Sequence, residues 1–293
     1  MTKIGWIGTG VMGAAQAGHL QDAGHELYVY NRTKSKTDGL VAKGAVYCET
    51  PKTVAEAADV IFTMVGYPRD VREVYFEGIF QAENIAGKIV VDMTTSEPGL
   101  AVEIAKKAVE LGASALDAPV SGGDIGAKNG TLTIMVGGTQ KTFDAVLPFF
   151  QAMGKTITLE GSAGTGQHTK MANQIGIAGT MTAMCELLAY AGAAGLDFDK
   201  LLATLGGGGA STWSLTNYAP RILAEDYTPG FFVKHFVKDL GIALTCAKEM
   251  GLNLPATAQA NGLYEKLASE GFENDGTQAL MKLYWGEGKR PER

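Results

Sequence analysis

A lysine and two side-chain amides stand close together in an otherwise apolar segment of the chain. Lys170, Asn173 and Gln174 occupy positions i, i+3 and i+4, so they share one face of a helix. A lysine in an apolar helix is costly to bury unless it is used or paired. Burial and a nearby positive charge both lower the pKa of a lysine, which suits it to proton exchange near neutral pH. The spacing therefore predicts a general acid/base; the alternative is a lysine that extends to the surface.

A second motif offers groups that hold a carboxylate. Ser121, Gly122 and Gly123 follow a predicted strand that ends at Asp117. A hydroxyl next to exposed backbone N–H groups forms a natural anion-binding nest. The alternative is a turn that binds no ligand.

The glycines near the N-terminus follow a Gly-x-Gly-x-x-Gly pattern between an expected strand and an expected helix. Gly8, Gly10 and Gly13 carry the pattern, with Val11 and Met12 before the last glycine. Such glycines allow a tight turn, a close approach to a pyrophosphate and close packing of helix on strand. The N–H groups of the helix N-terminus then face the phosphates. The pattern predicts a dinucleotide site; the alternative is an ordinary glycine-rich turn.

The residues after the second expected strand bear on the choice of cofactor. Asn31 stands near the point where NAD-binding proteins carry an acidic residue, and Arg32 follows it. A guanidinium pairs well with the 2′-phosphate of NADP, which a carboxylate would repel. Thr33, Lys34 and Lys36 add to this region. We therefore predict NADP, with NAD use left open; the alternative is a solvated basic helix start.

Other strand ends should line the same cofactor site. Met64 and Val65 end one expected strand, near the adenine-ribose side, and Thr95 follows the next, near the nicotinamide. Ligands of open α/β sheets bind outside the carboxyl ends of the strands.

Lys238 and Asp239 lie in a later helical segment. Because neighbours in a helix point about 100° apart, we do not expect them to form one surface pair; the alternative is an exposed charged helix start.

The elements that position these residues change character along the chain. In the first half, strand-like runs alternate with helix-length segments, which favours a parallel sheet with crossover helices. In the second half only helices are expected, beginning with a long apolar one that joins the two parts. We predict domains over residues 1–163 and 164–293. The expected strands are 4–7, 26–30, 60–65, 89–92 and 114–117, and the expected helices are 11–23, a polar one through 43, 97–111, 166–194, 198–205, 213–223, 233–249, 256–268 and 278–284.

Composition narrows the class of protein. The 293 residues are 46% hydrophobic and 19% charged with a net charge of −6, as in a globular protein without a nucleic-acid partner. No signal peptide or uncharged stretch of about 18 apolar residues is seen, so we expect a cytoplasmic protein and no membrane partner. Three dispersed cysteines and four dispersed histidines predict no metal site. The apolar helical half predicts a homodimer or homotetramer.

Taken together, the motifs in this order and spacing resemble the β-hydroxyacid dehydrogenase family, which includes 3-hydroxyisobutyrate dehydrogenases and succinic semialdehyde/glyoxylate reductases. The resemblance covers essentially the whole chain. It implies an α/β Rossmann-like N-terminal domain and an all-α C-terminal domain joined by a long helix. It also implies hydride transfer between NADP(H) and a small β-hydroxy acid or its semialdehyde, of the 3-hydroxyisobutyrate kind.

The resemblance also implies roles for particular residues. Lys170 would be the catalytic lysine, Lys238 would lie beside the nicotinamide, and Thr95 would lie near both cofactor and substrate. Members of the family commonly carry Asn four residues after the lysine, whereas this chain has Asn173 followed by Gln174, and either amide could reach the substrate. The residues implied to bind the substrate are Ser121, Gly122, Gly123, Phe231 and Asp239.

Several alternatives stay open. The substrate could instead be succinic semialdehyde, glyoxylate or tartronate semialdehyde. An imine reductase resembles the family but usually lacks a lysine at the position of Lys170. A decarboxylating phosphogluconate dehydrogenase would be a longer chain with phosphate-binding basic residues. The last alternative, from a different class of protein, is a non-catalytic NADP-binding sensor.

Overall fold

The computed structural model describes residues 2–289 and divides the chain into two compact units, Met1–Lys170 and Met171–Arg293. The division falls inside the long helix α8 (Thr165–Ala193), directly after Lys170. The predicted domain boundary between residues 163 and 164 lies just before this helix and stays a prediction. Residues 1 and 290–293 of the predicted domains lie outside the described part of the chain.

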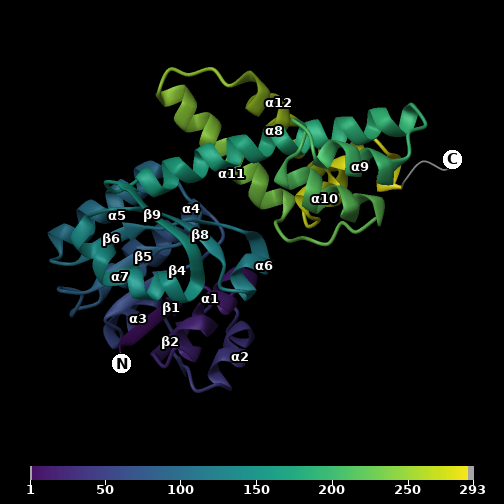
Figure 1. Ribbon diagram of the computed structural model, residues 1–293. Helices are drawn as coiled ribbons and strands as arrows, with labels where there is room; N and C mark the ends of the chain where they lie inside the picture. The colour runs from purple at the N-terminus through teal and green to yellow at the C-terminus, as the bar shows by residue number, and fades with distance from the viewer. Residues whose placement is uncertain (1, 290–293) are drawn as a thin grey trace. The chain divides into compact units, whose positions relative to one another are not determined.

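The first unit is built on one mixed sheet (Figure 1). Within residues 2–289 its strand order is β3-β2-β1-β4-β5-β6-β8-β7, and β9 pairs with β8. The chain reverses its direction across the sheet between β1 and β4, which is where doubly wound folds bind ligands. The strands are β1 (Lys3–Ile7), β2 (Glu26–Tyr30), β3 (Val46–Tyr47), β4 (Val60–Thr63), β5 (Ile89–Asp92), β6 (Ser114–Asp117), β7 (Val120–Ser121), β8 (Leu132–Gly137) and β9 (Gly154–Gly161).

The expected parallel sheet is confirmed for the five predicted strands, and the structure adds β3 at one end and β7, β8 and β9 beyond β6. β8 runs antiparallel to β6 and β7, and only β9 pairs with it in parallel. The central strands were predictable because strands covered on both faces carry nearly continuous apolar runs, as Val60–Phe62 of β4 does. β9 escaped prediction because its side chains alternate between partly and fully exposed positions. The expected strand over 60–65 ends at Thr63, so Met64 and Val65 follow it.

Helices cover both faces of the sheet and form two apolar cores with it. One core holds α1 and α7, where Trp6 of β1 stacks on Phe62 of β4 with ring centroids 5.4 Å apart. The other holds α3 and α5. The expected polar helix through Lys43 is instead a 3-10 turn, Lys34–Thr37, and a short α2. The helices of this unit are α1 (Val11–Asp22), α2 (Asp38–Val41), α3 (Pro51–Ala57), α4 (Pro68–Arg72), α5 (Pro98–Glu110), α6 (Gly123–Lys128) and α7 (Gln140–Met153).

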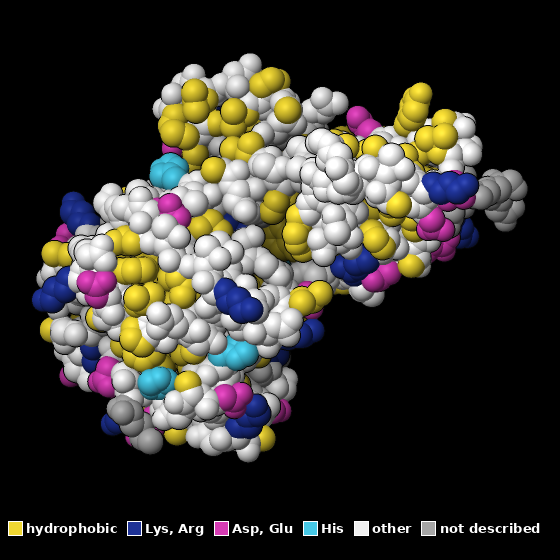
Figure 2. Space-filling view, viewed as in Figure 1, with side chains coloured by type: hydrophobic (Ala, Val, Ile, Leu, Met, Phe, Trp, Pro, Cys, Tyr) yellow, Lys and Arg dark blue, Asp and Glu magenta, His cyan; other side chains and the backbone are white. Residues whose placement is uncertain are grey.

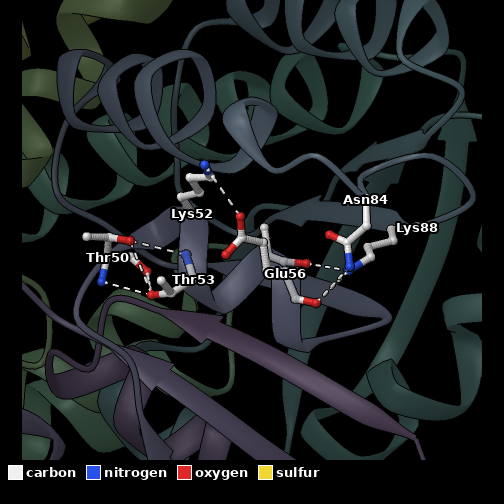
Figure 3. A network of polar contacts seen from close by, with 7 residues as sticks. Thr50, Lys52, Thr53, Glu56, Asn84 and Lys88 are labelled. Carbon is white, nitrogen blue, oxygen red and sulfur yellow. Dashed lines mark hydrogen bonds and ion pairs between the residues drawn. The ribbon is translucent and has the colours of Figure 1, made fainter.

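Both ends of α3 are fixed by polar groups, as Figure 3 shows. At the start, Thr50 and Thr53 form a reciprocal capping box. At the end, the Lys88 ammonium donates to the backbone oxygens of Ala55 and Glu56. A cation at the carbonyl end of a helix satisfies groups that lack intrahelical partners. This network therefore stabilises a helix that packs on the sheet.

The second unit is helical, and the predicted fold class is confirmed. Its core gathers buried side chains such as Met181 and Cys185 of α8, Phe236 of α11 and Tyr264 of α12. The segment expected as a helix over 278–284 is a 3-10 helix, Thr277–Leu283. After α8 follow α9 (Phe198–Gly206), α10 (Trp213–Leu223), α11 (Val233–Glu249) and α12 (Pro255–Leu267).

Helix α8 is the one helix within residues 2–289 that is long and apolar enough to cross a bilayer by length and composition. Core helices of globular proteins pass the same test, and α8 buries Met181, Met184, Cys185 and Leu188 in the core of the second unit. The helix is thus weak evidence for a membrane span, and the absence of a membrane partner stays a prediction.

Candidate active site

The glycine loop between β1 and α1 has the backbone geometry that its pattern predicts. Gly8 has φ +96°, and a Cβ there would overlap the carbonyl oxygen of Met64. A Cβ on Gly13 would overlap the carbonyl oxygen of Gly8. A Cβ on Gly10 would meet no atom of the described residues within 4 Å. Gly8 and Gly13 therefore close the turn, while Gly10 leaves open space in front of it.

The same loop fits a dinucleotide pyrophosphate. Gly10 is the N-cap of α1 and supplies no side-chain hydrogen bond to the first turn, whose N–H groups are suited to a phosphate. The Thr9 hydroxyl is buried and has no hydrogen-bond partner among the described residues. An orphaned buried hydroxyl beside uncapped N–H groups is what a bound anion would satisfy.

The end of β2 is tied to this loop by Asn31. Its amide oxygen accepts the Thr9 N–H at 3.0 Å, and its amide nitrogen donates to the Thr33 carbonyl at 2.9 Å. The Arg32 side chain is 83% exposed, and its guanidinium lies 3.5 Å from the carboxylate of Asp70 on α4. Asp70 was missed in the sequence because it lies far along the chain. A phosphate that binds Arg32 would have to compete with this carboxylate.

The ends of β4 and β5 are joined through a buried carboxyl. Thr94 accepts the Val65 N–H on its hydroxyl at 3.0 Å. Asp92 accepts the Thr63 hydroxyl at 2.8 Å and the Thr94 N–H at 3.0 Å. Burial raises the pKa of Asp92 to about 6, although these hydrogen bonds oppose the shift. The loop that carries Thr95 is therefore fixed to the segment that carries Met64 and Val65.

The start of α8 is held on the strand ends by two residues that were not predicted as site residues, Asp117 and Gln167. The Asp117 carboxylate accepts the N–H groups of Gly164 and Gln167 at 2.7 and 2.9 Å. The side chain of Gln167 donates to the Thr94 carbonyl at 2.7 Å and accepts the Ser96 N–H at 2.9 Å. Burial raises the pKa of Asp117, and the two N–H donors oppose that rise. These bonds fix the first turn of α8 on the ends of β5 and β6.

Lys170 lies on α8 one turn after Gln167 and is 5% exposed. The alternative of a lysine that extends to the surface is therefore wrong. Its helix face is set by the bonds at the start of α8. The structure thus places a buried amine on a fixed element, as a general acid/base requires.

The Ser121-Gly122-Gly123 segment has a backbone that favours glycine. β7 ends at Ser121 and α6 begins at Gly123. Gly122 and Gly123 have φ values of +126° and +63°. Two successive residues with positive φ turn the chain sharply at the end of the strand. This geometry agrees with the predicted turn and leaves its ligand untested.

In the second unit, the side chains of four predicted site residues are linked to one another by hydrogen bonds and an ion pair. Asn173 donates from its amide to the amide oxygen of Gln174 at 2.8 Å, and Gln174 donates to the Asp239 carboxylate at 2.7 Å. The Lys238 ammonium lies 3.1 Å from the other Asp239 oxygen. Lys238 and Asp239 do form an ion pair, but it is buried, so the expectation that they form no surface pair holds. The alternative of an exposed charged helix start is wrong. Burial and the charge of Lys238 lower the pKa of His235 to about 4.

Phe231 packs, partly buried, against the core of the second unit. Its ring packs edge-on against Phe236 at 5.8 Å, and its carbonyl accepts the Thr277 N–H. Across residues 2–289, no three His, Cys, Asp or Glu side chains form a group that could hold a metal ion.

Two family models match nearly the whole chain. The NAD-binding domain of 6-phosphogluconate dehydrogenase matches residues 3–161, and the NAD-binding domain of NADP-dependent 3-hydroxyisobutyrate dehydrogenase matches residues 164–284. The 2-hydroxy-3-oxopropionate reductase of Escherichia coli (strain K12) is 43% identical over 96% of both chains. The chain belongs to the β-hydroxyacid dehydrogenase family. The expected resemblance is confirmed.

Two further proteins are similar to this chain over nearly their full lengths. The uncharacterized oxidoreductase YkwC of Bacillus subtilis (strain 168) is 52% identical over 96% of this chain and 98% of its own. The structure of 3-hydroxyisobutyrate dehydrogenase from Mycobacterium tuberculosis, with L-serine, superposes with a TM-score of 0.89 at 29% identity, over 97% of this chain and 99% of that one. This β-hydroxyacid dehydrogenase is thus an oxidoreductase with NAD(P)-binding domains.

Proposed function

We propose that this chain transfers a hydride between NADP(H) and a small β-hydroxy acid or its semialdehyde, with 3-hydroxyisobutyrate as the model substrate. The observation that carries the proposal is the buried Lys170, held on the first turns of α8 by Gln167 and Asp117. A non-catalytic sensor needs no buried amine at this position. An imine reductase usually lacks the lysine.

The proposed chemistry assigns the proton to Lys170. When bound, the nicotinamide supplies or accepts the hydride. The Lys170 ammonium donates a proton to the carbonyl oxygen of the semialdehyde as that carbon is reduced, and the neutral amine accepts the hydroxyl proton in the reverse direction. Acid–base help of this kind is worth about 10² to 10⁴ in rate. Ser121, Gly122 and Gly123 would bind the substrate carboxylate, and Phe231 and Asp239 would line its site.

NADP is the proposed cofactor because the end of β2 carries Asn31 and Arg32 in place of an acidic residue. The exposed Arg32 side chain is available to a 2′-phosphate once it leaves Asp70. NAD remains a second cofactor because Asp70 competes with a 2′-phosphate for the Arg32 guanidinium. The remaining cofactor contacts are assigned to Gly8, Gly10, Val11, Met12, Gly13, Thr33, Met64, Val65, Thr95 and Lys238.

A second candidate substrate is 2-hydroxy-3-oxopropionate, which is tartronate semialdehyde. The 43% identity to the E. coli reductase named for it favours this reaction over succinic semialdehyde or glyoxylate reduction. Both leading candidates are three-carbon semialdehyde acids or their methyl derivatives, so the same carboxylate and carbonyl groups would be recognised.

The test is NADPH oxidation across a panel of semialdehydes and glyoxylate, with NADH in parallel. We expect turnover with methylmalonate semialdehyde or tartronate semialdehyde. Lys170→Ala should reduce turnover by at least about 100-fold while NADPH fluorescence titration gives an unchanged affinity. Lys128→Ala removes an exposed lysine as the matched control. Turnover of Lys170→Ala within a few-fold of that of the unmutated enzyme would contradict the assignment of Lys170 as the general acid/base.

A further inference from the structure

A carboxylate on α4, that of Asp70, lies within 3.5 Å of the Arg32 guanidinium beyond the end of β2. We propose that Asp70 sets the selectivity between the two cofactors: it accepts a ribose hydroxyl of NAD, and it weakens the binding of the NADP 2′-phosphate to Arg32. The proposal rests on the proposed cofactor site. No residue of α4 was predicted as a site residue, and every side chain in the argument belongs to the first unit.

The backbone holds the Asp70 carboxylate in place. Its Oδ2 accepts the Tyr67 N–H at 3.1 Å, and the N–H groups of Asp70 and Val71 both donate to the Tyr67 carbonyl. Val71 is fully buried in the core that holds α3 and α5. The Asp70 side chain is 14% exposed. The direction of the carboxylate is therefore fixed, and Oδ1 is the oxygen that faces Arg32.

This oxygen can replace the acid that is missing at the end of β2. NAD sites usually carry a carboxylate there, which accepts the ribose hydroxyls. Asn31 stands at that point instead, and both ends of its amide are bonded to backbone, with the oxygen on the Thr9 N–H and the nitrogen on the Thr33 carbonyl. Asp70 brings a carboxylate to the same region from a different element. A hydroxyl donates more strongly to a carboxylate than to a neutral acceptor.

Arg32 is held only weakly by Asp70. Its side chain is 83% exposed, and ion pairs of exposed arginines at such distances contribute little to stability. A phosphate can bind a guanidinium through two parallel hydrogen bonds, so it displaces a single carboxylate contact. The Lys34 ammonium is directed elsewhere, since it lies 3.9 Å from the Glu49 carboxylate and 4.3 Å above the Tyr47 ring.

The cost of binding NADP comes from the carboxylate that Arg32 leaves behind. The Asp70 carboxylate and the 2′-phosphate then lie on either side of one guanidinium, and two anions at short distance repel each other. The ribose hydroxyl of NAD meets no such repulsion and gains an acceptor. Asp70 therefore favours NAD and opposes NADP, while Arg32 does the reverse, and the two residues together set the ratio of the affinities.

The test measures the dissociation constants of NADPH and NADH by fluorescence titration of the full-length protein without substrate. Asp70→Asn keeps an oxygen for the Tyr67 N–H but removes the charge. It should tighten NADPH binding and weaken NADH binding, so that the ratio of the two constants moves about tenfold toward NADPH. Asp38→Asn removes an exposed carboxylate at the start of α2 as the matched control, and it should leave the ratio within about twofold.

Three results would overturn the role of Asp70: an unchanged ratio in Asp70→Asn, an equal change for both cofactors, or a shift that Asp38→Asn reproduces. If Asp70→Asn does not fold, Asp70→Ser replaces it, because a serine hydroxyl also accepts the Tyr67 N–H without a charge, and the same shift toward NADPH is expected. Neither constant depends on turnover. An unmutated enzyme that reduces no semialdehyde would contradict the proposed function and leave the selectivity result standing.

Discussion

Asp92 shows how burial can outweigh hydrogen bonding at a single residue. The Thr63 hydroxyl and the Thr94 N–H both donate to its carboxyl group, and each favours the charged form. Burial nevertheless raises the pKa from 3.8 to about 6, and the neighbouring carboxyl of Asp117 adds to the rise. Asp92 and Asp117 are direct partners across β5 and β6, so two carboxyl-bearing residues sit side by side at the ends of these strands.

This shift makes the stability of the fold depend on pH with a definite sign. The folded state binds the Asp92 proton more tightly than the unfolded state does. Its contribution to stability is therefore complete below pH 3.8 and is lost as the pH rises through about 6. At neutral pH the residue stays charged at a cost that approaches about 3 kcal/mol, from roughly 1.4 kcal/mol per pKa unit.

Asp92→Asn should remove this cost because an amide keeps the acceptor oxygen but carries no charge. We expect the melting temperature of the variant to exceed that of the parent at pH 8 and to exceed it by roughly half as much at pH 5. Asp144→Asn, which changes an exposed carboxylate on α7, is the control and should show no such trend. An equal difference at both pH values would show that Asp92 does not titrate as described.

Residue-level reasoning from the sequence identified the types of side chain but not their partners. Lys170 and the glycine loop stand out from their immediate neighbours along the chain. Asp70 beside Arg32 does not, because the contact depends on where α4 lies. The buried pair of Lys238 with Asp239 was not expected either, since helix geometry alone points neighbours apart while a long lysine chain can bend back.

At the scale of elements, the join between α8 and the sheet is the feature on which the proposed chemistry depends. Gln167 is fully buried and bonds to backbone groups on both sides of Thr95. Asp117 fixes the same turn of the helix from the end of β6. The loop after β5, the end of β6 and the first turn of α8 are therefore joined by hydrogen bonds into one corner of the first unit.

Gln167→Leu should loosen this corner. The change leaves the Thr94 carbonyl and the Ser96 N–H buried without partners, which costs about 1–3 kcal/mol for each group. We expect a lower melting temperature together with a reduced kcat, because Lys170 lies one turn further along α8. Gln151→Leu alters an exposed glutamine on α7 as the control. A kcat equal to that of the control would show that the corner does not position the lysine.

The elements themselves were predictable to different degrees for a physical reason. Buried central strands and the long apolar helix have a hydrophobic pattern that one sequence reveals. The expected bounds 166–194 for the long helix differ by one residue at each end from Thr165–Ala193. β3 and β7 are two residues long, and β9 is largely exposed, so they form through pairing with neighbouring strands and carry little pattern of their own.

At the scale of the whole molecule, the second unit leaves apolar side chains at its surface. Figure 2 shows such side chains (yellow) in patches over the helices of this unit. Tyr190 is 76% exposed and Trp213 is 65% exposed. Between the exposed face of α8 and the start of α10 lies an apolar groove of about 240 Å³, lined by Gly179, Thr180, Ala183, Met184, Leu187, Ala210, Thr212 and Leu215.

Apolar surface of this kind is typical of an interface between copies of a chain, so we expect a homodimer or homotetramer in solution. Ala183→Arg places a charge in the groove and should shift the molar mass from light scattering toward that of one chain. Val109→Arg alters an exposed apolar residue on α5 of the first unit and should leave the mass unchanged. A single-chain mass for the unmutated protein at micromolar concentration would contradict the expectation. An oligomer unaffected by Ala183→Arg would place the interface on another face, since a buried, unpaired arginine could not be accommodated in the groove.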